Sequence, residues 1–296
     1  MKILISGATG FIGKNLIKRL LLDGHSISAL IRSSTNKKNV PKNISCFTLT
    51  NNGDDLVRFL EQEKYDGVIH LASLFLPHHE MKDISNLIDS NILFSTTLLE
   101  AAHKANVSWF INTGTIWQNY ESKKYSPVNL YAATKQAFED IAQYYIETSS
   151  INFVTIKLSD TFGPGDTRQK IFNLLLKTSK NETTLDMSPG EQIIDISYIE
   201  NITDGYSHMI NLLSKDLKRK LHGKSFVLYS DKRLTLKKMV SLFEKIAQVS
   251  LKINWGGKEY RKREIMIPWS GGKPIPGWKP TVSLEKGIEK TLNELM

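Results

Sequence analysis

Apolar residues in the first half of the chain alternate between short continuous runs and longer stretches with a helical period. The short runs predict strands at residues 2–6, 25–31, 44–49, 68–72, 107–112 and 153–158. The periodic stretches predict helices at residues 11–22, 54–63, 85–105 and 131–148. Apolar strands that alternate with helices indicate a parallel sheet covered on both faces. The pattern therefore predicts an α/β protein with a Rossmann-like, doubly wound parallel sheet.

The alternation is lost after residue 158, where the chain becomes rich in loops. A strand at residues 190–200 and a helix at 201–214 resume it, whereas residues 255–280 are rich in Gly, Pro and Trp. We predict a Rossmann domain and a smaller C-terminal lobe over the carboxyl ends of the strands. The domain comprises residues 1–160 and about 193–215, and the lobe comprises residues about 161–192 and 216–296.

The turn after the first predicted strand has the sequence Gly7-Ala8-Thr9-Gly10-Phe11-Ile12-Gly13 and opens the first predicted helix. Glycines let a backbone approach a pyrophosphate, and a helix N-terminus offers unpaired N–H groups and the positive end of a dipole. An ordinary tight turn is the alternative, because the spacing is not the usual G-x-G-x-x-G. The strand-turn-helix context favours a dinucleotide site at Gly7, Thr9, Gly10, Phe11, Ile12 and Gly13.

The end of the second predicted strand bears on the choice of dinucleotide. An NAD site favours an acidic residue there, which accepts a hydrogen bond from the ribose 2′-hydroxyl, whereas an arginine suits the 2′-phosphate of NADP. The strand ends in Ile31-Arg32, with no acid nearby. The alternative is an exposed surface arginine. The sequence thus predicts NADPH, with Arg32 at its 2′-phosphate.

Tyr131 and Lys135 lie four residues apart at the start of a long amphipathic helix, so they share one helical face. A nearby cation lowers the pKa of a phenol from about 10. A tyrosine so tuned can exchange a proton with a carbonyl or alcohol oxygen. Tyr120 and Lys124 have the same spacing but lie in a polar stretch, and we treat that pair as chance.

Hydroxyl residues end the fifth predicted strand, at Thr113-Gly114-Thr115. The carboxyl ends of strands in such a sheet border the crevice where ligands bind. One of these hydroxyls is thus placed to contact the substrate oxygen that Tyr131 protonates. A polar turn with satisfied hydroxyls is the alternative.

Composition narrows the classes of ligand. The chain of 296 residues is 41% hydrophobic and carries a formal net charge of +9. Its basic residues occur in short groups without a nucleic-acid-reading motif, so we expect anionic small ligands and no nucleic acid. No apolar run approaches the roughly 20 residues of a membrane span, and Ile3-Leu4-Ile5 is too short for a signal peptide, so we expect a cytoplasmic protein without membrane contact.

The single cysteine, Cys46, lies in the third predicted strand, and we expect a small core residue rather than a reactive thiol. No Cys/His cluster has the spacing of metal ligands, so we predict no metal.

These motifs together resemble the extended short-chain dehydrogenase/reductase family over nearly the whole chain. Further matching segments are His70-Leu71-Ala72-Ser73, Phe162-Gly163-Pro164-Gly165, Asp195-Ile196-Ser197-Tyr198-Ile199-Glu200 and Gly277-Trp278-Lys279-Pro280. Within the family, the chain is most similar to bacterial reductases that make CDP-linked deoxysugars for lipopolysaccharide O-antigens.

The resemblance implies hydride transfer from NADPH to the C4 ketone of a nucleotide-linked, CDP-type 4-keto-deoxysugar. Tyr131 would donate the proton, and Lys135 would tune Tyr131 and hold the nicotinamide ribose. The family's catalytic hydroxyl corresponds to Thr113, three residues before Ile116 of the Ile116-Trp117 pair. Leu71, Ala72 and Ser73 would contact the cofactor. Ser73, Thr115 and Arg168 would contact the substrate, the lobe would bind its nucleotide, and a homodimer would form through helices 85–105 and 131–148.

Departures from the family pattern separate the activities within it. Dehydratases have Asp-Glu directly after the threonine, where this chain has Gly114-Thr115. Epimerases that retain NAD carry an acid where this chain has Arg32. Ile194 replaces the arginine that many relatives have before Asp195, so the phosphate contact at that position is absent. Arg168 is a candidate substitute, and an exposed loop arginine is the alternative. An epimerase with tightly bound NAD and a non-catalytic NADPH-binding sensor stay as alternatives.

Overall fold

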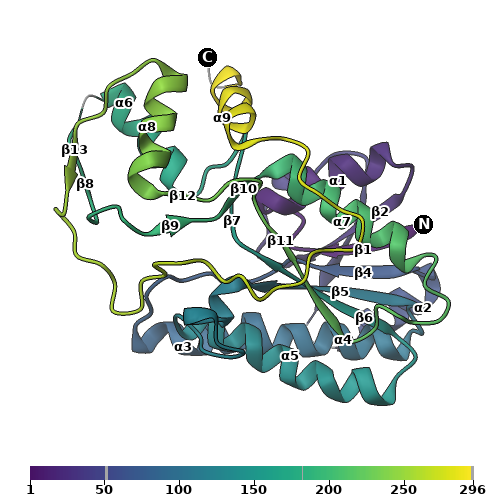
Figure 1. Ribbon diagram of the computed structural model, residues 1–296. Coiled ribbons are helices and arrows are strands. Elements are labelled where there is room, and N and C mark those ends of the chain that lie inside the picture. The colour runs from purple at the N-terminus through teal and green to yellow at the C-terminus, as the bar shows by residue number, and fades with distance from the viewer. Residues whose placement is uncertain (51–52, 182, 295–296) are drawn as a thin grey trace.

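The computed structural model describes residues 1–50, 53–181 and 183–294. Its main feature is a seven-stranded parallel sheet with the order β11-β6-β5-β4-β1-β2-β3 (Figure 1). The strands are β1 Lys2–Ser6, β2 Ser26–Arg32, β3 Ser45–Leu49, β4 Gly67–His70, β5 Trp109–Thr115, β6 Asn152–Leu158 and β11 Lys224–Leu228. The strand order reverses between β1 and β4, which places a ligand crevice at their carboxyl ends. The predicted Rossmann-like fold is confirmed.

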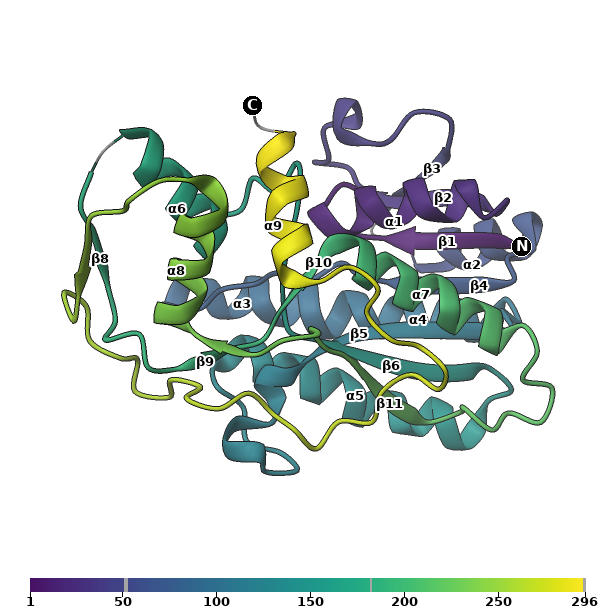
Figure 2. The same ribbon diagram turned by 45° about the horizontal axis from the view of Figure 1, so that its top comes forward.

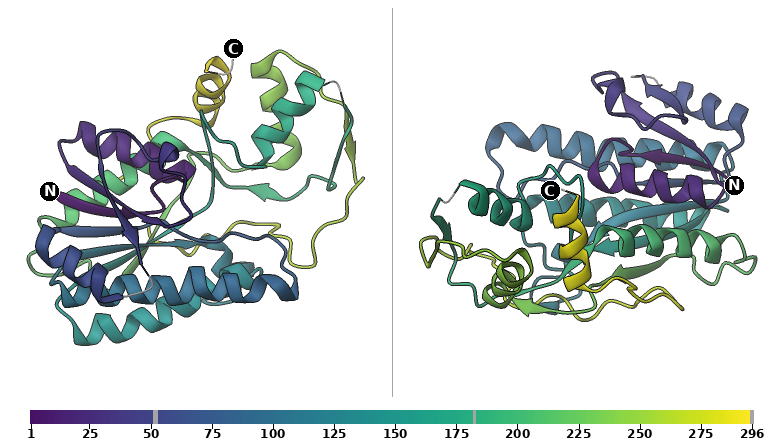
Figure 3. Two further views of the ribbon diagram at one scale, coloured as in Figure 1. Left: turned by 180° about the vertical axis from the view of Figure 1, so that it is seen from behind. Right: turned by 90° about the horizontal axis from the view of Figure 1, so that it is seen from above.

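Helices cover both faces of this sheet (Figures 1 and 3). One face carries α1 Phe11–Leu22 and α7 Ile199–Leu213, and the other carries α2 Gly53–Glu63, α4 Phe94–Lys104 and α5 Leu130–Thr148. Successive β1 side chains point to opposite faces of the sheet. Ile3 and Ile5 pack in the core under α1 and α7, and Leu4 packs in the core on the other face. Burial on both faces explains the continuous apolar strands.

The smaller lobe lies beyond the carboxyl edge of the sheet (Figure 2). Its helices are α6 Ile171–Asn181, α8 Leu236–Ala247 and α9 Leu284–Asn293. Short strand pairs complete it: β7 Asp160–Phe162 with β10 Ile196–Tyr198, β9 Ile193–Ile194 with β12 Leu234–Thr235, and β8 Leu185–Met187 with β13 Ile253–Trp255.

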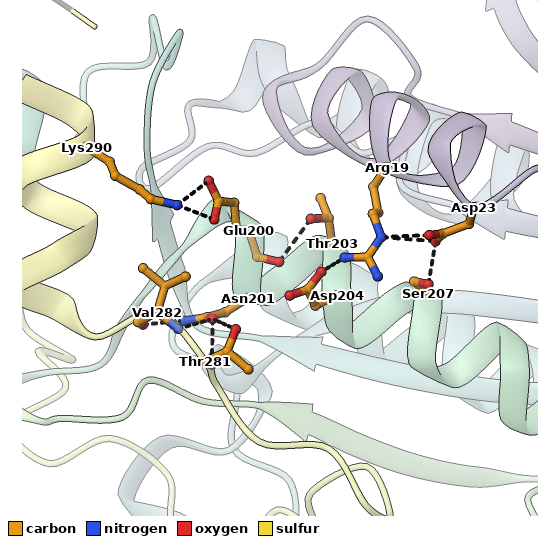
Figure 4. Close-up of polar contacts among 10 residues, drawn as sticks. All are labelled: Arg19, Asp23, Glu200, Asn201, Thr203, Asp204, Ser207, Thr281, Val282 and Lys290. Carbon is orange, nitrogen blue, oxygen red and sulfur yellow. Dashed lines mark hydrogen bonds and ion pairs between the residues drawn. The ribbon is translucent and has the colours of Figure 1, made fainter. Parts of the chain in front are cut away.

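Helix α7 is fastened to the Rossmann domain by polar contacts with α1 (Figure 4). Arg19 of α1 forms an ion pair with Asp204 of α7. The Ser207 hydroxyl donates to Asp23 Oδ2 at 2.6 Å. These contacts fix the orientation of α7 against the helix that follows the glycine turn.

The N-terminal end of α7 also holds the C-terminal segment of the lobe (Figure 4). Asn201 Oδ1 accepts from the backbone N–H groups of Thr281 and Val282, each at 2.9 Å. The Lys290 ammonium of α9 pairs with Glu200 at 2.7 Å. Helix α7 therefore connects the lobe to the sheet.

Two predicted elements are interrupted in the structure. The helix expected at 85–105 consists of α3 Ile84–Ile88, a π-helical turn Asp89–Leu93 and α4. The strand expected at 190–200 is split into β9 and β10 by Asp195. Its buried carboxylate accepts from the Ser230 backbone N–H at 3.1 Å and pairs with Arg233 at 2.7 Å.

Two further expectations differ from the structure. Strand β11 lies in the segment assigned to the lobe, but it pairs with β6 at the edge of the large sheet. The expectation of a core position for Cys46 is wrong, because β3 is the opposite edge strand and its thiol is exposed.

Candidate active site

The glycine turn is packed too tightly for side chains at two positions. Gly7 has φ +77°, and a Cβ there would lie 2.7 Å from the Ala72 backbone nitrogen. A Cβ on Gly13 would lie 2.2 Å from the Gly7 carbonyl oxygen. Gly10 caps α1 without a side chain, so the first N–H groups of the helix remain available to an anion. The turn, which includes Thr9, Phe11 and Ile12, therefore fits the pyrophosphate of a dinucleotide.

Arg32 ends β2 on the same edge of the sheet as this turn. Its side chain is exposed, and its guanidinium has no hydrogen-bond or ion-pair partner among the residues the structure describes. A free guanidinium at this place is consistent with a ligand phosphate.

A cavity of about 180 Å³ opens at the carboxyl edge beside the turn. It brings together most of the residues predicted for catalysis and substrate binding. Its lining includes Ile12, Leu71, Ser73, Thr113, Thr115, Tyr131, Lys135 and Arg168. The structure thus joins residues from the glycine turn, the loop after β4, β5, α5 and the loop after β7 in one site.

Burial controls the titration of the Tyr131 and Lys135 pair. It raises the pKa of Tyr131 to about 12, with Asp160 adding to the rise and Ser73 opposing it. It also lowers the pKa of Lys135 to about 8. The structure therefore differs from the expectation that Lys135 depresses the pKa of Tyr131, because loss of hydration disfavours both charged forms.

Thr113 has a partner that the sequence did not indicate. Its Oγ1 lies 2.6 Å from the hydroxyl of Tyr206, which is fully buried in the middle of α7. Tyr206 follows the apolar stripe of its helix, so no local pattern distinguished it from an ordinary core aromatic. The contact fixes the Thr113 hydroxyl beside the Tyr131 ring in the cavity wall.

Asn91 is a second residue that the sequence analysis missed. It lies in the π-helical turn and is fully buried. Its Oδ1 accepts from Ser73 Oγ at 3.0 Å and from the Leu74 backbone N–H at 2.8 Å, and its Nδ2 donates to Thr134 Oγ1 at 3.0 Å. Asn91 thus holds the loop after β4 against α5, and its polar neighbours Asp89 and Ser90 left no sequence signal that singled it out.

Arg168 lines the cavity but is already engaged. It donates to both carboxylate oxygens of Asp166, at 2.7 and 2.8 Å, and to Thr161 Oγ1 at 2.9 Å. Its guanidinium also lies 4.6 Å from the centre of the Phe11 ring. These contacts orient Arg168 in the wall between the turn and the substrate cavity.

Within residues 1–50, 53–181 and 183–294, no group of three or more His, Cys, Asp or Glu side chains is arranged to hold a metal ion. Nor does this part of the chain contain a helix long and apolar enough to cross a bilayer.

Fold and site together define a member of the extended short-chain dehydrogenase/reductase class. The chain belongs to the NAD dependent epimerase/dehydratase family, whose model matches residues 3–221. CDP-abequose synthase from Salmonella typhimurium is 27% identical over 309 aligned positions, which cover 99% of this chain and 98% of that protein. CDP-abequose synthase from Yersinia pseudotuberculosis is 26% identical over 271 positions, covering 90% and 92%.

Among solved structures, UDP-glucuronic acid 4-epimerase from Bacillus cereus, in complex with UDP-glucuronic acid and NAD, superimposes with a TM-score of 0.85. The two chains are 22% identical, and the match covers 100% of this chain and 99% of the epimerase. This likeness supports the fold, and the family membership confirms the resemblance found in the motifs.

Proposed function

We propose that the protein is an NADPH-dependent reductase of the C4 ketone of a nucleotide-linked, CDP-type 4-keto-deoxysugar, and that its product is a precursor of O-antigen deoxysugars. The main support for this proposal is one cavity beside the glycine turn, which Thr113, Tyr131 and Lys135 line together. Relatives named CDP-abequose synthase support the CDP sugar as substrate.

The protonation states of Tyr131 and Lys135 are consistent with reduction. Bound NADPH supplies the hydride. A phenol with a pKa of about 12 retains its proton at neutral pH, so Tyr131 is able to donate it to the ketone oxygen. The Lys135 ammonium stabilises the phenolate that forms, and Tyr206 holds the Thr113 hydroxyl for contact with the same oxygen. An epimerase would instead need Tyr131 to begin as a base.

The cavity also lacks the carboxylates of an elimination site. Gly114 and Thr115 occupy the positions where dehydratases of the family have an acid pair. Asp160 is the one carboxylate among the described residues that line the cavity, and it pairs with Lys170 at 2.7 Å. Among the described residues, no unpaired acid therefore lines the cavity.

The activity is tested by NADPH consumption with purified protein against CDP-, dTDP-, GDP- and UDP-linked 4-keto-6-deoxysugars, including 3-deoxy forms. We expect turnover with a CDP sugar, and NMR of the product gives the C4 configuration. NAD that copurifies with the protein, together with product that differs only in C4 configuration, would favour the epimerase. NADPH binding without turnover across the panel would favour the sensor.

Cofactor preference has its own test at Arg32. A second cavity, of about 350 Å³, is lined by Phe11 and by charged residues of both signs, namely Lys14, Lys18, Lys38, Glu200 and Glu294. We expect Arg32→Glu to weaken NADPH binding by about tenfold or more, because a charged hydrogen bond contributes about 1.5–3 kcal/mol, and to affect NADH little. Titration of each nucleotide by fluorescence measures this, with Lys252→Glu in the lobe as the control. Equal loss of both nucleotides would contradict the role of Arg32.

A further inference from the structure

A buried carboxylate lies directly behind the cavity wall, and the proposed reaction makes no use of it. Glu139 follows Lys135 by four residues on α5, so both side chains leave the same face of the helix. The side chain of Glu139 is 13% exposed. A Cβ on Gly114, between Thr113 and Thr115, would lie 2.9 Å from Glu139 Oε1. One layer of backbone therefore separates this carboxylate from the reacting groups.

Glu139 is joined to the cavity wall through Gln118. Gln118 Nε2 donates to Glu139 Oε1 at 2.9 Å, and Gln118 Oε1 accepts from the Thr115 backbone N–H at 2.9 Å. Gln118 is fully buried, so both bonds are shielded from water. The second carboxylate oxygen lies 3.7 Å from the Lys157 ammonium of β6. The ion-pair partner of the carboxylate is therefore Lys157, and Lys135 lies one helical turn away on the same face of α5.

The charged form of Lys135 depends on Glu139 more than the charged form of Lys157 does. Lys157 has a second partner, Asn119 Oδ1 at 3.2 Å. Lys135 as a whole residue is 2% exposed. Its ammonium makes no hydrogen bond or ion pair within the described parts of the chain. Burial lowers its pKa, and the charge of Glu139 opposes that change. Burial raises the pKa of Glu139 in turn, and Lys157, Gln118 and Lys135 oppose that rise.

Other titratable groups lie near this pair, on α5 itself and on neighbouring elements. They are His70, Tyr131, Tyr206, Asp160, Lys170, Arg168 and Asp140. Burial keeps His70 and the two phenols neutral near pH 7, since it lowers the pKa of the imidazole and raises those of the tyrosines. The cavity cations Lys170 and Arg168 are paired with Asp160 and Asp166. Asp140 is exposed and accepts from Gln136.

We propose that Glu139 is a positioning residue whose carboxylate keeps Lys135 protonated and, through Gln118, holds the backbone that carries Thr115. The consequence for turnover rests on the proposed reductase function, but the charge state of Lys135 is measurable without any sugar. Loss of the Glu139 charge lowers the pKa of Lys135 further, so the ammonium is lost at a lower pH. The alkaline limb of the activity profile then moves in the same direction.

The test compares wild-type protein with Glu139→Gln, which retains an oxygen for Gln118. Trace acetylation with acetic anhydride across a pH series, read by peptide mass spectrometry, gives the titration midpoint of Lys135. We expect the wild-type midpoint near pH 8 to fall by about one pH unit in the variant, the lower end of the effect of a nearby opposite charge. The alkaline limb of kcat/KM with NADPH and ketosugar should shift equally.

Controls separate charge from structure. Glu147→Gln removes an exposed carboxylate from the same helix and should leave the midpoint unchanged. Glu139→Asp retains the charge and should stay close to wild type, whereas a purely structural role predicts equal behaviour of the Asp and Gln variants. If Glu139→Gln does not fold, the double variant Glu139→Gln/Lys157→Met removes both charges of the buried pair. The titration midpoint of Lys135 should fall in this variant too.

Two results discriminate the inference from the reductase assignment. An unchanged Lys135 midpoint in a folded variant without the Glu139 charge overturns the inference. A shifted midpoint in a protein that reduces no ketosugar supports the inference on charge and counts against the reductase function alone.

Discussion

Replacement of Tyr131 by Phe is expected to reduce turnover of the ketosugar by about 10²–10⁴-fold, the usual contribution of a positioned proton donor. The substitution removes only the hydroxyl. The ring keeps its edge-on contact with Phe75, whose centroid lies 5.0 Å away. The protein should therefore fold normally and bind NADPH with wild-type affinity, as measured by nucleotide fluorescence alongside steady-state kinetics.

The matched control is Tyr144→Phe, which changes an exposed tyrosine on the same helix. It should leave kcat and KM unchanged. Wild-type turnover in Tyr131→Phe would remove the proton-donor assignment, whereas loss of NADPH binding would show that Tyr131 acts mainly on the cofactor. The expected pattern is a loss of kcat with retained binding.

The grouping of Thr113, Tyr131 and Lys135 in one cavity was predictable because these residues follow local rules. Tyr131 and Lys135 share a helical face through their spacing, and Thr113 lies at a strand end that parallel topology brings to the crevice. The glycine turn was recognisable for the same reason, since strand, turn and helix are contiguous in sequence. Each of these predictions needed only the period of a single element and the topology of the sheet.

The residues that support the centre follow no such rule. Tyr206 reaches Thr113 from 93 residues away, and Asn91 reaches Thr134 from 43 residues away. Each lies among other polar residues of its own helix, and only tertiary packing identifies its partner. The place of strand β11 was missed similarly, because only its pairing with β6 assigns residues 224–228 to the large sheet. Burial also decided the pKa of Tyr131 against the neighbouring cation.

Replacement of Gly13 by Ala is expected to have the second large effect. The new Cβ would lie 2.2 Å from the Gly7 carbonyl oxygen and 2.9 Å from Ala8 Cα. Both contacts are with backbone, so the turn itself must move rather than a flexible side chain. Forcing atoms into a close-packed site costs about 1–3 kcal/mol, and the free energy of unfolding should fall by that amount in denaturant titrations.

The same displacement moves the first turn of α1 away from the position that fits a pyrophosphate. NADPH binding must then restore the strained turn, so NADPH affinity should fall as well as stability. At the upper end of that cost, about 3 kcal/mol, the dissociation constant rises by about 100-fold. Gly53→Ala is the control, because a Cβ at the start of α2 would meet only Thr97 Cγ2, at 3.6 Å. Unchanged NADPH affinity in Gly13→Ala would mean that the dinucleotide does not approach this backbone, and the cofactor site would have to lie elsewhere on the carboxyl edge.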